Sequence, residues 1–139
     1  MTSVIESVVM ATTGEASSFG DLSLARTYLS GSGCQSTTRG LFAGGSLQPA
    51  NTGSDTIDYV TLATEGNAVD FGDAIHSDFR WMGAGMYSAT RGVHCGGYPA
   101  INTIQYITIA TTGNAVDFGD TRQVVSNSGN SSDVHGGLG

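Results

Sequence analysis

The sequence predicts an all-β protein made of repeated four-stranded antiparallel sheets, and three observations lead to this fold class. One is composition: among 139 residues there are 21 Gly and 2 Pro, and only 12% of residues are charged. Abundant Gly, Ser, Thr and Val with little charge is typical of short strands joined by tight turns. The other two are a segment that recurs three times and the strand-like alternation inside each copy.

The recurring segment is clearest around the heptad NAVDFGD. Residues Thr56–Asp73 match Thr103–Asp120 without gaps at an offset of 47, and Val4–Asp21 is a related segment 52 residues before the first. The remainder of the unit also recurs, because Asp21–Gly45 and Asp73–Gly97 have equal length with T-R-G and G-G in register. The chain is therefore a repeat protein with a unit of about 47 to 52 residues.

A third, partial copy of this second half ends the chain. Residues Arg122–Gly139 line up with Arg26–Ala43 if three residues are omitted after Asp120. The sequence thus predicts one repeat domain over residues 1–139, which divides into four parts. The parts are a half-blade at 3–21, blades at 24–73 and 79–120, and a half-blade at 121–139.

Each complete unit contains four strand-like runs, taken here from one copy. Ile57–Thr64 alternates and is rich in β-branched residues, Glu65–Asn67 supplies a turn, and Ala68–Phe71 returns. Arg80–Tyr87 and Thr90–Gly97 are the next two strands. In this interpretation Asn67 turns the hairpin, Val69 and Phe71 face a packing surface, and Gly72–Asp73 end the strand.

Four antiparallel strands per unit are typical of a propeller blade, and a period near 50 fits the kelch class better than the shorter WD40 period. Closed propellers need about four to eight blades, so three do not close alone. We expect the tail strands of one subunit to complete the leading half-blade of the next. Two subunits then make a six-bladed ring, or an open head-to-tail filament if the rotation does not close.

The order of strands, glycine doublets and aromatic residues resembles the kelch repeat. The matching positions are the doublets Gly44–Gly45 and Gly96–Gly97 and the tyrosines Tyr59 and Tyr106, whereas Phe19, Phe71 and Phe118 stand where kelch repeats usually have Trp. The phrase IDYVTLATEGNAVDFGD, followed by T-R-G and G-G, is similar to kelch-like repeats in structural proteins of tailed phages, particularly marine and cyanobacterial ones. This resemblance covers almost the whole chain.

The resemblance implies a structural or adhesive virion component, such as a capsid decoration, tail or fibre protein. Its partners would be other copies of the chain and other virion proteins. The protein would be made in the host cytoplasm and reside in the virion.

The charge distribution argues against several other classes of protein. The formal net charge is −7, and the basic side chains other than His are five scattered arginines: Arg26, Arg39, Arg80, Arg91 and Arg122. Nucleic acids and acidic membrane surfaces bind clustered basic residues, so neither is expected as a partner. The N-terminus has no basic region and carries Glu6, which argues against a signal peptide, and no apolar run approaches the roughly 20 residues of a membrane span.

Enzymatic activity and cofactor binding are not expected. The DFG triplets lack the HRD motif and Lys of a kinase, GSGCQST lacks the Lys of a phosphate loop, and no G-x-S-x-G elbow occurs. The histidines His76, His94 and His135 and the cysteines Cys34 and Cys95 occupy different places in the unit, so no metal site or disulfide is implied. Calcium ligands remain an alternative for Asp70, Asp73, Asp117 and Asp120, although turn Asp residues commonly accept backbone hydrogen bonds instead.

Two further sets of residues have functional interpretations. Arg39 and Arg91 occupy equivalent T-R-G positions, which favours a scaffold role such as a salt bridge to an Asp of a neighbouring blade over ligand binding. The loops that differ between copies are free to bind a ligand. Their candidate residues are Trp81 with His76, Asp78 and Arg80 in one loop, and Asn51 in the other. A Trp beside polar donors suits sugar stacking, so a lectin-like module binding surface glycans is the alternative function. The other interpretation of Trp81 is that it takes the core place of Leu29 in a strand.

Overall fold

The computed structural model describes residues 2–29, 34–76 and 85–126. These residues form strands and no helix, so the all-β prediction is confirmed. It follows that this part of the chain has no helix of the length and apolar character that crossing a membrane requires.

The strands group into three main units and one small hairpin. The N-terminal hairpin pairs β1 (Thr2–Ser7) with β2 (Ser17–Arg26). The first sheet contains β3 (Cys34–Gln35), β4 (Arg39–Ala43), β7 (Thr56–Thr61) and β8 (Val69–Asp73). The second sheet contains β9 (Gly85–Tyr87), β10 (Arg91–Cys95), β11 (Ile101–Thr108) and β12 (Val116–Val125). Between β4 and β7, the strands β5 (Ser46–Leu47) and β6 (Thr52–Gly53) form a short hairpin.

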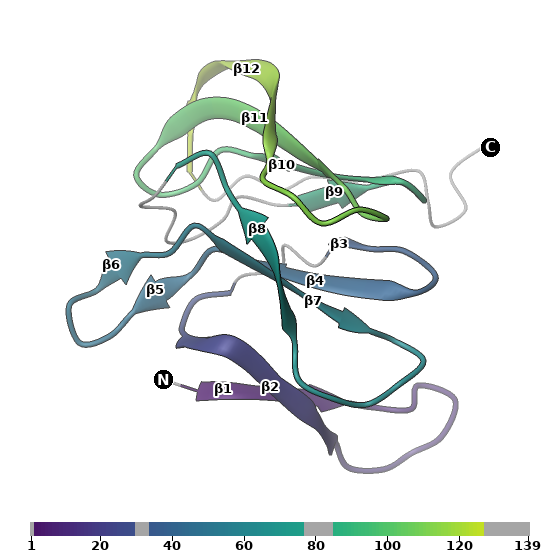
Figure 1. Ribbon diagram of the computed structural model, residues 1–139. Coiled ribbons are helices and arrows are strands. Elements are labelled where there is room, and N and C mark those ends of the chain that lie inside the picture. Colours follow the sequence, from purple (N-terminus) through teal and green to yellow (C-terminus); the bar gives the residue numbers. More distant parts are fainter. Residues whose placement is uncertain (1, 30–33, 77–84, 127–139) are drawn as a thin grey trace.

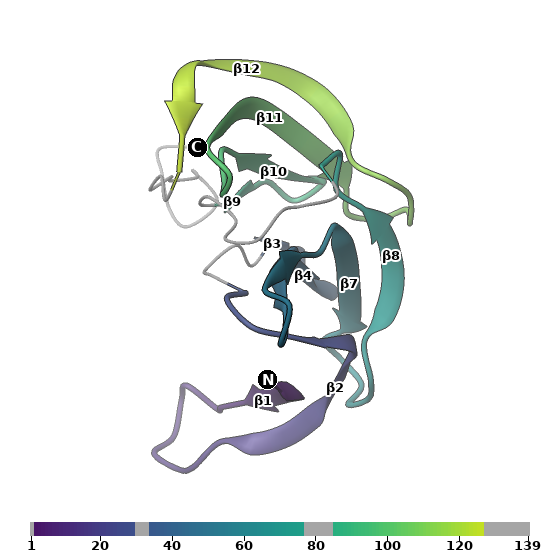
Figure 2. The same cartoon turned by 90° about the vertical axis from the view of Figure 1, so that its left-hand side faces the viewer.

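Both larger sheets are antiparallel and keep their strands in chain order, which confirms four-stranded antiparallel sheets for two units. The N-terminal hairpin, the first sheet and the second sheet follow one another in space (Figure 1). Figure 2 shows that β2, β8 and β12, the last strand of each unit, succeed one another along one side of the molecule. Within residues 2–29, 34–76 and 85–126, the sheets do not close into a ring.

The last two strands of every unit share one irregularity. In the first sheet the register steps from Ile57↔Gly72 to Asp58↔Asp70, which leaves Phe71 as the extra residue of a β-bulge. The same step leaves Phe19 extra between β1 and β2, and Phe118 extra between β11 and β12. The bulge therefore lies at the Phe of each F-G-D triplet.

The structure shows no gap directly after Asp120 in the third copy. A second irregularity pairs Thr2 with Arg26 in the N-terminal hairpin and Ile101 with Val125 in the second sheet. Residues 120–125 are therefore equivalent to 21–26 without a gap, and the expectation that three residues are omitted directly after Asp120 was wrong. The strands also extend beyond the expected blade boundaries, because β2 continues to Arg26 and β12 to Val125.

The hydrophobic core lies between successive units. One cluster joins the two larger sheets and contains Cys34, Leu41, Ala43, Ile57, Phe71, Ala74, Ile107 and Ile109. A second cluster joins the N-terminal hairpin to the first sheet and contains Ile5, Leu22, Val60 and Ala68. Each unit thus buries its apolar side chains against its neighbours, as expected when a single repeat cannot cover its own hydrophobic face.

Candidate assembly interface

A set of three hydrogen bonds joins the second sheet to the first. The backbone N–H groups of Gly113 and Ala115 donate to the carbonyl oxygens of Phe71 and Asp73, both at 2.8 Å. The Asn114 side chain between them accepts a hydrogen bond at Oδ1 from the Asp73 N–H, at 3.1 Å. We call this arrangement the clasp: a G-N-A segment of one unit bound to the F-G-D triplet of the unit before it.

The same clasp joins the first sheet to the N-terminal hairpin. Gly66 and Ala68 donate to the carbonyl oxygens of Phe19 and Asp21 at 2.9 and 2.8 Å. Asn67 Oδ1 accepts a hydrogen bond from the Asp21 N–H at 3.0 Å. Asn67 therefore connects two units, a role that its assignment as a turn residue had missed.

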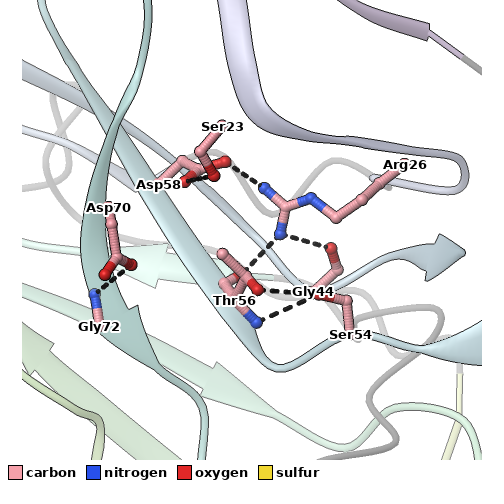
Figure 3. Close-up of polar contacts among 8 residues, drawn as sticks. All are labelled: Ser23, Arg26, Gly44, Ser54, Thr56, Asp58, Asp70 and Gly72. Carbon is pink, nitrogen blue, oxygen red and sulfur yellow. Dashed lines mark hydrogen bonds and ion pairs between the residues drawn. The ribbon is translucent and has the colours of Figure 1, made fainter.

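Gly72 of the F-G-D triplet and Asp70, which precedes the triplet, each have a physical reason to be present at the clasp. Gly72 has φ +144°, and a Cβ built on it would lie 2.6 Å from the backbone C and O of Gly113. Only glycine allows this close approach. Asp70 holds the bulge, since its Oδ1 accepts a hydrogen bond from the Gly72 N–H at 3.2 Å (Figure 3).

The bulge turns Phe71 into the core between the sheets, where it is 3% exposed. Its ring meets Tyr59 edge-on, with centroids 6.0 Å apart, and the Arg39 guanidinium stacks 4.5 Å from the Tyr59 centroid. Arg39 Nη1 also donates to the Ile109 carbonyl of the second sheet at 2.8 Å. Arg39 thus joins neighbouring units through a carbonyl, and in the described part of the chain it forms no ion pair with an Asp.

The second sheet repeats this stack, and among the described residues no further unit covers it. Arg91 lies 4.8 Å from the Tyr106 centroid, and Tyr106 meets Phe118 at 6.0 Å in the same edge-on geometry. Phe118, however, is 56% exposed. Identical local structure is therefore buried in one repeat and exposed in the next.

Two buried neutral groups also lie between the two larger sheets. Cys34 Sγ is 3.4 Å from His94 Nε2, and it occupies the space that a side chain at Gly92 would need. Burial raises the pKa of Cys34 to about 12 and lowers the pKa of His94 to about 4. Both groups are uncharged near neutral pH, which suits packing and gives Cys34 little thiolate for chemistry.

A buried ion pair fixes the end of β2 on the first sheet (Figure 3). Arg26 Nη2 donates to Asp58 Oδ2 at 2.5 Å, and both side chains are fully buried. Arg26 Nη1 donates to the carbonyl oxygens of Gly44 and Thr56 at 3.0 and 2.6 Å, and Ser23 Oγ donates to Asp58 Oδ1 at 2.6 Å. Burial lowers the pKa of Arg26, and the Asp58 charge and hydrogen bond oppose that shift. The hydrogen-bonded network compensates the charges where they leave water.

An apolar groove of about 230 Å³ runs beside β1. Ile5 and Phe19 of the N-terminal hairpin line one side, and Leu41, Phe42 and Val60 of the first sheet line the other. In the described chain β1 pairs only with β2, whereas β7 and β11 each have a further strand at the corresponding edge. The first two strands of each larger sheet lie at this edge. In the unit of the N-terminal hairpin, the groove takes the place of those two strands.

The candidate sugar-binding residues are only partly described. Trp81, Asp78 and Arg80 lie outside the described residues. His76 is half-buried with Nε2 3.0 Å from Thr103 Oγ1. Asn51 lies in the β5–β6 connection with φ +52°, and its Oδ1 accepts hydrogen bonds from Ser46 Oγ at 3.1 Å and Gln48 Nε2 at 3.4 Å. Asn51 thus shapes its own loop.

The calcium candidates have structural roles in the described chain. Asp70 and its counterpart Asp117 accept hydrogen bonds from Gly72 and Gly119, the second at 3.0 Å. Desolvation and the carboxylates of Asp55 and Asp70 raise the pKa of Asp73. Across residues 2–29, 34–76 and 85–126, no three His, Cys, Asp or Glu side chains are grouped as metal ligands, and this holds for Asp73 and Asp120 as well.

The glycine doublets mark sharp changes of chain direction. Gly44 and Gly45 have φ +67° and +103°, and Gly96 and Gly97 have φ +68° and +145°. A Cβ on Gly45 would lie 2.9 Å from the Thr27 carbonyl oxygen. The doublets thus need both the conformational freedom and the small size of glycine.

Comparisons with known proteins add no family assignment. No protein-family model matches the sequence, and no curated protein matches it significantly.

Proposed function

We propose that this protein is a non-enzymatic structural or adhesive component of a phage virion, such as a capsid decoration, tail or fibre protein, and that it assembles through shared propeller blades. The two larger sheets are complete blades in this proposal, and the N-terminal hairpin is the outer half of another. The virion assignment comes from the resemblance of the repeats to phage structural proteins. The geometry supports the assembly.

The groove beside β1 carries the proposal. It is apolar and follows the edge of β1 that has no partner strand in the described chain. Relative to β1, it lies where β4 and β3 lie relative to β7 in the first sheet. Open strand edges readily accept a strand from another chain. The proposed occupant is the C-terminal segment 126–139 of a second copy, whose sequence is the partial copy of the unit's first two strands.

The polar residues of the described chain support a scaffold over an active site. The buried histidine is held neutral, the buried thiol has a raised pKa, and Asp70 holds the β-bulge at Phe71. The buried Arg26 forms an ion pair with Asp58 and also donates hydrogen bonds to two nearby backbone carbonyls. These groups stabilise contacts between units.

The test is electron microscopy of phage particles labelled with an antibody against this chain, together with the purified protein alone. The proposal predicts label at regular positions on the particle and ordered rings or filaments of the purified chain. Particles without label would contradict the virion role. A purified chain that binds a glycan array and remains monomeric would favour the lectin alternative.

A further inference from the structure

We propose that residues Phe118–Asp120 of one copy form a clasp with Gly14–Ala16 of a second copy, so that copies join head to tail as the units inside the chain do. This inference rests on the proposed assembly and names the surfaces that carry it. Both segments are the third members of sets whose other members already bind one another.

The hydrogen-bonding groups for this contact are present on both sides. Gly14–Ala16 is equivalent to the G-N-A segments of the two observed clasps, and Phe118–Asp120 is equivalent to their F-G-D triplets. Within the described part of the chain, no backbone hydrogen bonds of the clasp type reach either segment. Gly119 already has φ +140°, close to the +144° of Gly72, and no atom lies within 4 Å of a Cβ built there. The triplet thus has the conformation of a bound triplet, while the described residues supply no partner for it.

The exposed apolar side chains match the same pairing. Phe118 is 56% exposed where Phe71 is 3% exposed. Near the partner segment, Met10 is 97% exposed, while its counterpart Ile109 is 1% exposed against the first sheet. Val8, at 63%, likewise corresponds to Ile107, at 2%. Phe71, Ile107 and Ile109 pack in one cluster at the internal contact. A second copy docked in the same register would therefore bury Phe118, Val8 and Met10.

One residue departs from the pattern. Glu15 stands where Asn67 and Asn114 accept a hydrogen bond from the Asp N–H of the triplet. A Glu carboxylate also accepts hydrogen bonds, but it would approach the carboxylates of Asp117 and Asp120, and like charges repel. The contact between copies is therefore expected to be weaker than the internal clasps, and reversible with concentration.

The register of this contact also fits the groove. The chain that leaves the first sheet after Asp73 continues to β9 of the next unit. By the same geometry, this docking would bring the end of β12, at Val125, toward β1 of the second copy, whose open edge borders the groove. One docking arrangement therefore accounts for both the exposed clasp segments and the groove beside β1.

The experiment uses sedimentation velocity on the full chain over a concentration series, with circular dichroism to verify the fold. Arg39 donates to the backbone of Ile109 at the internal contact, and Arg91 and Met10 are the equivalent residues of the proposed contact. Met10→Lys therefore places an ammonium group opposite the Arg91 guanidinium. Gly119→Ala places a methyl group where the partner backbone would lie, as at Gly72. Each substitution is expected to raise the dissociation constant at least about tenfold.

A matched control separates this effect from general damage. Val69→Ser removes an exposed apolar side chain at a position where the N-terminal hairpin already has Ser17. This control is expected to associate like the wild type.

Mixing the two variants gives the sharpest result. Met10→Lys retains an intact triplet and Gly119→Ala retains an intact partner segment, so a mixture is expected to form dimers and nothing larger. Glu15→Asn, which restores the motif, is expected to tighten association. A wild-type chain that associates while both variants associate equally well would overturn the clasp and leave the proposed function standing. A wild-type chain that stays monomeric would overturn both.

Discussion

The Asp73 backbone N–H donates a 3.1 Å hydrogen bond to the Oδ1 atom of Asn114, 41 residues later in the chain. Asp21 and Asn67 form the same bond at 3.0 Å across 46 residues. The first and last residues of the heptad NAVDFGD therefore form hydrogen bonds with different units. The Asn side chain accepts a hydrogen bond from the preceding unit, and the Asp N–H donates one to the Asn side chain of the following unit.

The first prediction concerns this side-chain bond. Asn114→Ala removes the acceptor for the Asp73 N–H and should lower the free energy of unfolding by about 1 kcal/mol. Urea denaturation followed by circular dichroism measures it. Thr112→Ala, two residues earlier on the same exposed loop, should change stability by less than about 0.5 kcal/mol. Equal losses for the two variants would mean that the Asn114 bond contributes nothing.

The second prediction concerns the close approach at the clasp. Gly72→Ala would put a methyl group 2.6 Å from the Gly113 backbone, so the sheets must separate or distort. Gly113→Ala has the same unfavourable sign of φ, at +154°, but meets no atom within 4 Å. We expect a loss of about 1 to 2 kcal/mol for Gly113→Ala from backbone strain alone, and clearly more for Gly72→Ala. Thermal or urea unfolding that ranks the two variants equally would refute the close contact.

The third prediction concerns the buried ion pair. Asp58→Asn leaves the Arg26 guanidinium charged and buried without its counter-ion, and should cost about 3 kcal/mol or more of unfolding free energy. Asp55 directly precedes β7, and its side chain forms no hydrogen bond within the part of the chain that the structure describes, so Asp55→Asn should be nearly neutral. Denaturant titration of both variants tests this, and a mild effect of Asp58→Asn would show that water reaches Arg26.

The fourth prediction concerns pH and His94. Burial lowers the folded-state pKa to about 4, below the ordinary value near 6.5, so the folded state prefers the neutral ring. The stability from this group is fully present above pH 6.5 and is lost as the pH falls toward 4. The loss amounts to at most about 3 kcal/mol.

His94→Phe isolates this contribution, because Phe42 occupies the equivalent position of the first sheet. The difference in unfolding free energy between the wild type and the variant should change between pH 7 and pH 4. A difference that stays constant over that range would show that His94 is not buried in its neutral form.

The repeat and its strands were predictable because they follow from residue patterns that recur at regular spacing in the sequence. Alternation in Ile57–Thr64 and the positive-φ glycines at 44–45 and 96–97 are local signals, readable without knowledge of neighbours. The role of Asn67 was not readable in this way. Asn is common both in turns and as a side-chain acceptor, and only the three-dimensional proximity of Asp21 separates the two roles.

The buried pair Arg26–Asp58 was also beyond the sequence. The partners are 32 residues apart, and the repeat offers no second example, since Gln105 stands at the position equivalent to Asp58. The expectation of a gap directly after Asp120 was wrong for a related reason. Sequence similarity after Asp120 is slight, and only the pairing of Ile101 with Val125 establishes the register.

A cryo-electron-microscopy reconstruction of the chain as it assembles in solution tests the head-to-tail arrangement most directly. The expected map shows Phe118–Asp120 of one copy against Gly14–Ala16 of the next, in the register of Phe71–Asp73 and Gly113–Ala115, with the groove beside β1 filled. Particles with the mass of one chain, or copies that meet through other surfaces with these segments still exposed, would contradict it.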